Sequence, residues 1–300
     1  MSEATGSNPE RAEMIALTDA VLDLFVGRSH ADARLARDLR YTENSQLLDV
    51  GDGFWATCSG RGRYRQYAID LHAMQAGFIG VMLENDRQVL FGMRLKLRGQ
   101  EIAEIEAMVS RDPILFYKDG PQKLEARQQP LALWTERVAE SERSSRADMI
   151  AIAEAYFNAL ERNDGTRSAP IAADCDRMDN GVMATHAPEF DKPGEPPFYA
   201  LGPAEQLATG YFRFVTRIRD RRYPVVDQDF GIVFSTSFLD HSGTVGEVKL
   251  TDGRTVPIGV DSPFSWQVME LFKISGGKIR QIEVLLNKCF YGMRPNWPAD

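Results

Sequence analysis

The chain has 300 residues, of which 43% are hydrophobic and 26% charged, and its formal net charge is −8. This length accommodates one large domain or two ordinary ones, and the acidic balance argues against a broad nucleic-acid surface, which needs clustered Lys and Arg. The three cysteines form no CxxC motif or Cys/His cluster, so we expect a reducing cytoplasm and no structural zinc site. The polar N-terminus has no apolar signal core, and no apolar run approaches the roughly 18 residues of a membrane span.

Helical signals open the chain. Residues 7–28 place apolar side chains at near-helical spacing, with Asn8 as a capping residue and Pro9 in the first turn. Residues 29–39 predict a second, shorter helix, with His30 close to its cap.

The sequence then changes to strand-like runs with turn signals between them. The predicted strands of this part are residues 64–74, 77–86, 88–99 and 101–111. Helices followed by strands are typical of an α+β fold with an antiparallel sheet. We therefore expect a first domain over residues 1–111.

A proline-containing connector follows over residues 112–143, with a short helix predicted at residues 131–142. The order of elements in the first domain then recurs. The predicted elements are helices at residues 144–162 and 202–215 and strands at residues 221–227, 231–241, 264–276 and 278–288. The second domain is expected to span residues 144–300.

An acid–Asn pair occurs twice in the chain, each time after helical sequence. Glu43–Asn44 in the first domain recurs as Asp179–Asn180 in the second. Self-similarity of this kind indicates an internal repeat, and here it predicts a tandem duplication.

A second motif supports the duplication. The last predicted strand of each domain contains Ile-x-x-Ile-Glu, which ends at Glu106 in the first domain and at Glu283 in the second. The second copy is longer, and insertions at residues 187–202 and 241–263 account for its extra length.

Several motifs are specific enough to suggest a family. They are residues 41–67, 174–182, 214–227, 238–245 and 270–297. With these motifs the chain resembles the SnoaL-like, nuclear-transport-factor-2-like superfamily, and more closely a bacterial and fungal family of tandem SnoaL-like proteins. The resemblance implies two cones, each with helices packed on a curved antiparallel sheet around an apolar pocket. Two positions depart from the family pattern: Asp179 stands where Glu is expected, and His72 where Pro is expected.

Enzymes of this superfamily include cofactor-free isomerases, dehydratases, cyclases and epoxide hydrolases, and formaldehyde lyases that act on lignin-derived aromatic dimers. The resemblance therefore implies acid–base chemistry on a small hydrophobic aromatic substrate. Its most concrete form is a lyase that releases formaldehyde from a lignin-type dimer and yields a stilbene through a quinone methide. The alternatives are an isomerase or dehydratase of a polycyclic substrate and a non-catalytic module that binds a hydrophobic ligand or a protein.

In the first domain, Glu43 is the expected acid or base. Neighbouring strand residues point to opposite faces, so one member of the acid–Asn pair faces the pocket together with Tyr41. An apolar pocket around Glu43 would suit a proton carrier, while Asn44 would satisfy backbone groups at the end of the sheet. We also expect Asn44 and Trp55 to contact the substrate. The alternative is that Glu43 is a structural carboxylate that ties helix to sheet.

The second domain offers a related set. Arg177 lies on the same strand face as Asp179, an arrangement that suits a base or a binding clamp. The resemblance implies that Tyr41 and Arg177 hold a phenol or phenolate and that Asp179 or His72 is the second proton carrier. Asn180 is expected beside the substrate. The alternative for Asp179 and Arg177 is a buried structural ion pair.

Three histidines have distinct expected places. His72 is predicted on a strand, in the same alternation as Asp70, where it could shuttle protons or be a satisfied core histidine. His186 borders the first insertion and is expected to reach the second pocket. His241 is interpreted as a loop residue at a turn.

An arginine-rich stretch precedes the strands of the second domain. If it is extended, Arg217, Arg219 and Arg221 share one face, where Arg217 would bind a carboxylate or phenolate. The alternative is a solvated edge strand, on which charges discourage aggregation.

No phosphate-binding glycine loop, hydrolase triad order or metal-ligand spacing accompanies these residues. We therefore expect neither a metal nor an organic cofactor, and neither a nucleic acid nor a membrane as a partner. The expected partner is a small hydrophobic aromatic substrate, for which the abundant aromatic side chains supply a lining. The sequence leaves a homo-oligomer open, as well as which domain is active.

Overall fold

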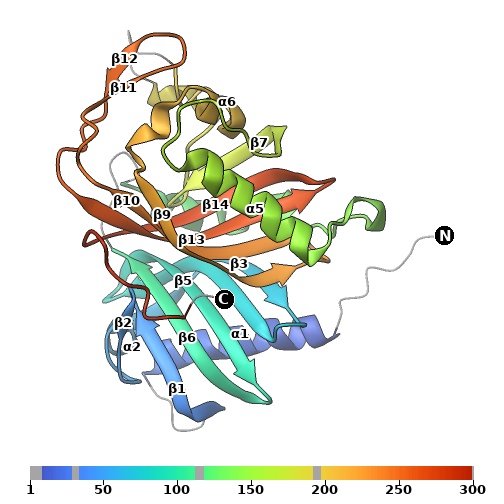
Figure 1. The fold of residues 1–300 in the computed structure, drawn as a ribbon. Helices are drawn as coiled ribbons and strands as arrows, with labels where there is room; N and C mark the ends of the chain where they lie inside the picture. The colour runs from blue at the N-terminus through green and yellow to red at the C-terminus, as the bar shows by residue number, and fades with distance from the viewer. Residues whose placement is uncertain (1–8, 29–33, 112–117, 192–196, 299–300) are drawn as a thin grey trace.

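The computed structural model of the protein describes residues 9–28, 34–111, 118–191 and 197–298. It consists of two halves, each of which combines helices with a six-stranded sheet (Figure 1). The strand order is β2-β1-β6-β5-β4-β3 in the first sheet and β8-β7-β14-β13-β10-β9 in the second. The predicted α+β fold with two tandem units is confirmed. Among the described helices, none combines the length and the apolar character that a membrane crossing requires.

The first half starts with a long helix and continues into its sheet. Its elements are α1 (Pro9–Gly27), β1 (Leu35–Glu43), β2 (Gln46–Leu47), α2 (Phe54–Thr57), β3 (Cys58–Asp70), β4 (Gln75–Glu84), β5 (Arg87–Arg98) and β6 (Glu101–Ser110). Short helices follow in the connector. They are α3 (Gly120–Arg127), α4 (Ala132–Thr135) and η1 (Glu140–Glu142).

The second half repeats this order with additional short elements. It comprises α5 (Arg146–Leu160), β7 (Ile171–Asp179), β8 (Val182–Met183), η2 (Pro188–Phe190), α6 (Pro203–Ala208), η3 (Tyr211–Phe214), β9 (Arg217–Asp227), β10 (Ile232–His241), β11 (Glu247–Lys249), β12 (Thr255–Pro257), β13 (Phe264–Ser275) and β14 (Lys278–Cys289). The predicted insertions correspond to η2 with its flanking loop and to the ribbon of β11 and β12.

Two predictions about the start of each sheet are wrong. β1 runs parallel to β6 and β7 runs parallel to β14, so each sheet is mixed rather than antiparallel throughout. Leu35–Glu43 is a strand, not part of a helix over residues 29–39; residues 29–33, with His30, lie outside the described residues. β1 pairs with β6 at Leu35 and from Arg40 to Glu43, and Tyr41 is buried, so long-range pairing outweighs a local helical pattern.

The repeated asparagine secures the junction between the first and last strands of each sheet. Asn44 has φ 46° and Asn180 has φ 45°, in the left-handed region that asparagine tolerates. The Asn44 side chain donates to Val109 O at 3.1 Å, and Val109 N–H donates to Asn44 Oδ1 at 2.8 Å. Asn180 makes the same two bonds with Leu286, at 3.1 and 2.7 Å. The expectation that Asn44 satisfies backbone groups at the sheet end is confirmed.

The two sheets pack against each other, and each long helix covers the opposite face of its own sheet (Figure 1). The side chains buried between the sheets include Ile79, Leu90 and Met108 of the first half and Phe234, Met269 and Leu285 of the second. Glycines permit the close approach, because a Cβ at Gly77 would lie 2.6 Å from the Phe234 ring and one at Gly92 would lie 2.7 Å from Met269 Sδ.

Carboxylates are exchanged between the halves in a symmetrical manner. Asp70, at the end of β3, accepts a hydrogen bond from the backbone of β9 at 2.9 Å. Asp227, at the end of β9, accepts one from the backbone of β3 at 3.1 Å. Asp70 also pairs with Arg146 of α5, and Asp227 pairs with Arg11 of α1. Each long helix is therefore tied to a strand of the other half.

The glutamate of the repeated Ile-x-x-Ile-Glu motif lies in the same interface. Glu106 pairs with Arg94 at 2.8 Å and with Arg222 of the second half. Glu283 instead accepts a hydrogen bond from Tyr64 Oη of the first half at 2.8 Å, and burial raises the pKa of Glu283 to about 7. The motif thus identifies buried polar contacts between the halves.

We expect Asn180→Ala to lower the free energy of unfolding by about 2 kcal/mol, because it leaves the Leu286 N–H without its partner and places alanine at positive φ. Asn180→Gly loses the same hydrogen bonds but tolerates the backbone conformation, so it should cost less. Denaturant unfolding of both variants, and of the corresponding Asn44 variants, measures this. An unchanged midpoint for Asn180→Ala would show that the junction does not depend on the amide.

Candidate functional site

We call the space between each sheet and its long helix a cone, and the first cone is filled by aromatic side chains. Phe25, Phe54, Trp55 and Phe91 are fully buried. The Phe25 and Trp55 ring centroids are 4.5 Å apart, and Phe54 stacks on Phe91 at 5.0 Å. Phe54 and Trp55 belong to α2, so this short helix fills part of the first cone with two aromatic side chains.

Glu43 is bonded into this filled core. Its carboxylate accepts hydrogen bonds from the N–H of Phe54, the first residue of α2, and from Arg111 Nη2 at 2.8 Å. The Tyr41 hydroxyl lies 3.4 Å from Glu43 Oε2, and burial raises the pKa of Tyr41. Tyr41, Glu43 and Trp55 therefore lie close together, as predicted, but in a packed environment. The contacts of Glu43 agree with the alternative of a structural carboxylate that ties helix to sheet.

The second cone contains a cavity of about 120 Å³. Its lining comes from α5, from η3 and from β7, β10, β13 and β14. The lining residues are Tyr156, Leu160, Arg177, Asp179, Phe212, Phe214, Val215, Leu239, His241, Trp266, Val268, Glu270, Val284 and Leu286. Two of the predicted site residues, Arg177 and Asp179, thus line this cavity.

The registers of the two sheets explain why the second cone has space. One row of facing residues in the first sheet is Glu43, Ala107, Met93 and Phe78. The corresponding row in the second sheet is Asp179, Val284, Glu270 and Ser235. A bulky apolar pair, Met93 and Phe78, is therefore replaced by a carboxyl and a small hydroxyl.

Two further positions of the second cone lack an aromatic ring. Phe91 corresponds to Val268, since each faces the residue of the last strand that is bonded to the repeated asparagine. Phe25 of α1 corresponds to Leu160 of α5. Each lies the same number of residues after the helix arginine, Arg11 or Arg146, that pairs with an aspartate of the other half. Because protein interiors are close-packed, the loss of these rings leaves an unfilled space.

Arg177 and Asp179 form an ion pair at the cavity. Arg177 Nε donates to Asp179 Oδ1 at 3.0 Å, and the two residues are 6% and 8% exposed. The Phe212 ring lies 5.4 Å from the guanidinium, and Tyr156 of α5 interacts with Arg177. Burial raises the pKa of Tyr156, so its phenol is neutral at neutral pH. The predicted common face of Arg177 and Asp179 is confirmed.

Glu270 is a site residue that the sequence pattern did not indicate. It is 3% exposed, and its side chain lines the cavity. Burial, followed by the negative charge of Asp179, raises the pKa of Glu270 to about 8. The available signal was an acidic residue in the middle of an apolar strand, at the position where the first half has Met93.

His241 also lines the cavity, although a loop position was expected. It is the last residue of β10 and is 2% exposed. His241 Nδ1 lies 3.1 Å from Leu239 O, so the Nδ1–H donates to this carbonyl and Nε2 is left as an acceptor. Its ring stacks on Phe264 with centroids 4.5 Å apart and an interplanar angle of 5°. Burial lowers the pKa of His241 to about 4, so the imidazole is neutral at pH 7.

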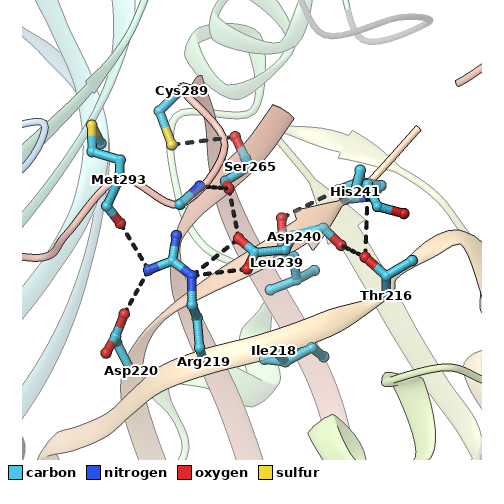
Figure 2. Close-up of polar contacts among 12 residues, drawn as sticks. Thr216, Ile218, Arg219, Asp220, Leu239, Asp240, His241, Ser265, Cys289 and Met293 are labelled. Atoms are coloured by element: carbon cyan, nitrogen blue, oxygen red, sulfur yellow. Dashed lines mark hydrogen bonds and ion pairs between the residues drawn. The ribbon is translucent and has the colours of Figure 1, made fainter. Parts of the chain in front are cut away.

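A polar network next to His241 holds the ends of three strands together, as Figure 2 shows. The Asp240 carboxylate accepts hydrogen bonds from Arg219 Nε at 2.9 Å and from Ser265 Oγ at 2.6 Å. Thr216 Oγ1 donates to the Asp240 carbonyl at 2.9 Å. Arg219 Nη1 donates to Met293 O at 2.7 Å, which adds the C-terminal segment to the network. β9, β10 and β13 are thereby fixed beside the cavity.

The arginines of β9 do not share one face, contrary to expectation. Arg217 is exposed, Arg219 belongs to the Asp240 network, and Arg221 pairs with two glutamates on or next to α5. Asp220, with φ 52°, interrupts the alternation between Arg219 and Arg221. Arg217 is not among the residues that line the cavity.

Aromatic residues from the first insertion and from η3 form a connected group, which we call the aromatic cover. Its members are Phe198, Tyr199, Tyr211, Phe212 and Phe214. The Phe198 ring lies 4.3 Å from Tyr211 and 5.5 Å from Phe212, which lines the cavity. Burial, with smaller effects of Tyr211 and Asp179, raises the pKa of Tyr199 to about 12. The aromatic cover therefore shields the Arg177–Asp179 pair from water.

Two predicted histidines lie outside the cavity. His72 is exposed in the turn between β3 and β4, so its predicted place on a strand is wrong. His186 has φ 49° and is exposed, and its Nδ1 lies 2.7 Å from Asp176 Oδ1. Neither residue is among those that line the cavity.

The cavity therefore combines a protonated carboxyl, a carboxylate paired with an arginine, and a neutral imidazole. Glu270 can donate a proton, Asp179 can accept one, and His241 can accept a hydrogen bond. Among the described residues, the cavity included, no group of three or more His, Cys, Asp or Glu side chains is arranged to hold a metal ion. The polar set matches acid–base chemistry in an apolar enclosure.

Exchanging the corresponding residues of the two long helices should change stability in opposite directions. Phe25→Leu opens space in the filled first cone and should lower the free energy of unfolding by about 1–3 kcal/mol. Leu160→Phe fills the cavity of the second cone and should leave stability unchanged or higher. Denaturant unfolding of both variants measures the difference. Equal losses in the two would contradict the assignment of one filled and one open cone.

Comparison with known proteins gives a family match in the second half of the chain. Residues 142–286 match the family model of a domain of unknown function, DUF8021. No curated protein matches the chain. The crystal structure of a de novo designed protein with a curved β-sheet aligns with 48% of this chain and 88% of its own, at 17% identity and a TM-score of 0.25, too low to support an argument. The half of the chain that holds the cavity therefore contains a DUF8021 domain.

Proposed function

We propose that the second cone is the active site of an enzyme that transfers protons to and from a small hydrophobic molecule without an organic cofactor. The observation that carries this proposal is Glu270. Burial in apolar surroundings disfavours the charged form of a carboxyl, so such a group keeps its proton to higher pH. Glu270 is 3% exposed, it lines a cavity, and its pKa is raised, which together are typical of a catalytic acid.

In this proposal Glu270 is the acid and Asp179 is the base. With a pKa of about 8, Glu270 holds its proton at neutral pH and donates it to a carbonyl or leaving oxygen of the substrate. Asp179, whose Oδ1 accepts a hydrogen bond from Arg177 Nε at 3.0 Å, takes a proton from carbon. The two residues flank Val284 in one row of the sheet, so a substrate above Val284 meets both. The substrate gains one proton from Glu270 and loses one to Asp179, so the total charge of the site is unchanged.

The same two roles serve several reactions. With a ketone, donation to the carbonyl and removal of an α-proton give an enol, which is the route to isomerisation. With a benzylic or β-oxygen, donation to the leaving oxygen and removal of a proton give dehydration or another elimination. The aromatic cover supports either course, because exclusion of water strengthens the electrostatic interactions of the site.

Formaldehyde-releasing cleavage of a lignin-type dimer is the most specific form of this proposal, and the family resemblance supports it. The cavity of about 120 Å³ is close to the roughly 150 Å³ that encloses one benzene ring. A dimer would place its second ring beyond this space, against the aromatic cover. The volume therefore favours single-ring substrates within the same reaction class.

Turnover without added cofactor tests the proposal. The protein is incubated in D₂O with cyclic ketones, single-ring benzylic alcohols and diarylpropane dimers, and NMR follows exchange and product formation while a separate assay follows formaldehyde. We expect Glu270→Gln and Asp179→Asn to lower kcat/KM by about 100-fold or more.

Glu43→Gln is the matched control, because Glu43 occupies the corresponding row in the filled first cone. It should retain the activity of the native protein. Full activity of Glu270→Gln would contradict the proposed acid. A ligand that binds without any turnover would favour the alternative of a non-catalytic binding module.

The raised pKa of Glu270 also predicts a pH dependence of stability. Between pH 5 and 8 the unfolded chain loses the Glu270 proton while the folded protein keeps it, so the free energy of unfolding falls as the pH rises, by up to about 1.4 kcal/mol per pH unit. Glu270→Gln removes this contribution and should gain stability relative to the native protein across that range. Denaturant unfolding at several pH values measures it, with exposed Glu247→Gln as the control. Parallel pH curves for native protein and Glu270→Gln would show an ordinary carboxyl.

A further inference from the structure

The charges at the cavity of the second cone balance, and this limits what the cavity can bind. The positive charge of Arg177 is paired with the negative charge of Asp179 at 3.0 Å. Glu270 carries its proton at neutral pH and His241 is an uncharged imidazole. A carboxylate or phenolate would therefore enter a water-poor space without a counter-ion of its own, which is strongly unfavourable.

His241 offers a fixed hydrogen-bond acceptor. The contact of Nδ1 with Leu239 O assigns the ring proton to Nδ1 and leaves the lone pair on Nε2. Stacking on Phe264 at 5° holds the plane of the ring, and Phe214 lies 5.5 Å away on another element. A ligand group that meets Nε2 has to be a donor, such as a hydroxyl.

Glu270 offers the opposite function at the other end of the cavity. In the paired strands β10 and β13, His241 faces Phe264 whereas Glu270 faces Ser235, so the two groups are six residues apart, or about 20 Å of strand. Both residues line the cavity, so a ligand that spans it along the strands meets His241 at one end and Glu270 at the other. The protonated Glu270 carboxyl donates a hydrogen bond, so the group that meets it has to be an acceptor oxygen.

We propose that the second cone selects an uncharged single-ring molecule that presents a hydroxyl to His241 at one end and an acceptor oxygen to Glu270 at the other. His241 is thus a specificity residue, and a para-substituted hydroxyphenyl ketone is the simplest molecule of this class. This inference rests on the proposed function in placing the substrate in this cavity. It revises the expected role of Arg177, whose guanidinium pairs with Asp179 instead of binding a substrate phenolate.

Equilibrium binding at pH 6 tests the inference separately from catalysis. Isothermal titration measures the Kd of 4-hydroxyacetophenone, of acetophenone, which lacks the hydroxyl, and of 4-hydroxybenzoate, which carries a charge. We expect the native protein to bind 4-hydroxyacetophenone about tenfold more tightly than either of the others. Tighter or equal binding of 4-hydroxybenzoate, or no binding of 4-hydroxyacetophenone, would overturn the proposal, and the native protein suffices for both outcomes.

A histidine variant then tests the acceptor. His241→Phe keeps the stacked ring but removes Nε2, and it should abolish the preference for 4-hydroxyacetophenone over acetophenone while the discrimination against 4-hydroxybenzoate remains. His186→Phe is the matched control outside the cavity and should change neither ratio. A preserved hydroxyl preference in folded His241→Phe would exclude His241 as the specificity residue. These experiments measure binding and not turnover. A lack of turnover would therefore refute the proposed reaction but would not affect the measured preference for the hydroxyl.

Discussion

The packing of the two sheets against each other is the constraint on which the rest of the structure depends. It buries apolar side chains on one face of each sheet and leaves the face under the long helix as the place where a cone can hold a ligand. The exchange of Asp70 and Asp227 fixes this packing, since each carboxylate meets both the backbone and a helix arginine of the other half. Neither half can shift relative to the other without breaking these contacts.

Duplication allows the two cones to differ, and the difference can be understood from its effect on the stability of the protein. At about 24 cal/mol per Å³, a cavity of 120 Å³ costs about 3 kcal/mol, and the burial of Glu270 adds to this cost. Such losses are a large fraction of the stability of an ordinary domain. The first cone contains the fully buried rings of Phe25, Phe54 and Phe91 instead. We infer that the filled half stabilises the chain and permits the open half to keep an unfavourable site.

Sequence patterns predicted the fold and the Arg177–Asp179 pair of the site but not Glu270 or the place of His241, and particular residues show why. Alternation predicted the long strands, and the Asn44–Asn180 repeat identified the sheet junctions, because both depend on local chemistry. The helix expected at residues 29–39 was wrong because pairing with β6 is a long-range contact that no local pattern reveals. Glu270 was missed for a similar reason: its importance is visible when it is aligned with Met93, which requires the register of two sheets.

The same limit applies to the comparison of Glu43 with Asp179. Within the sequence they are the equivalent acids of two copies, and the nearby difference is that Tyr41 accompanies Glu43 whereas Arg177 accompanies Asp179. The structure separates them through the residues that follow each acid–Asn pair. In the first half these residues lead directly into α2, whose Phe54 bonds to Glu43 and whose Trp55 plugs the cone.

In the second half, the corresponding place in the chain holds an insertion that supplies Phe198 and Tyr199 to the aromatic cover. An insertion that lies over a cone, rather than inside it, leaves the acid accessible from the cavity and still screens it from water. The position of Asp179 in the sheet is therefore not what distinguishes it from Glu43. The distinction arises from the segment that covers each acid, which is α2 in the first half and the insertion in the second. In the sequence, this distinction is encoded by the length of the segment that follows the acid–Asn pair.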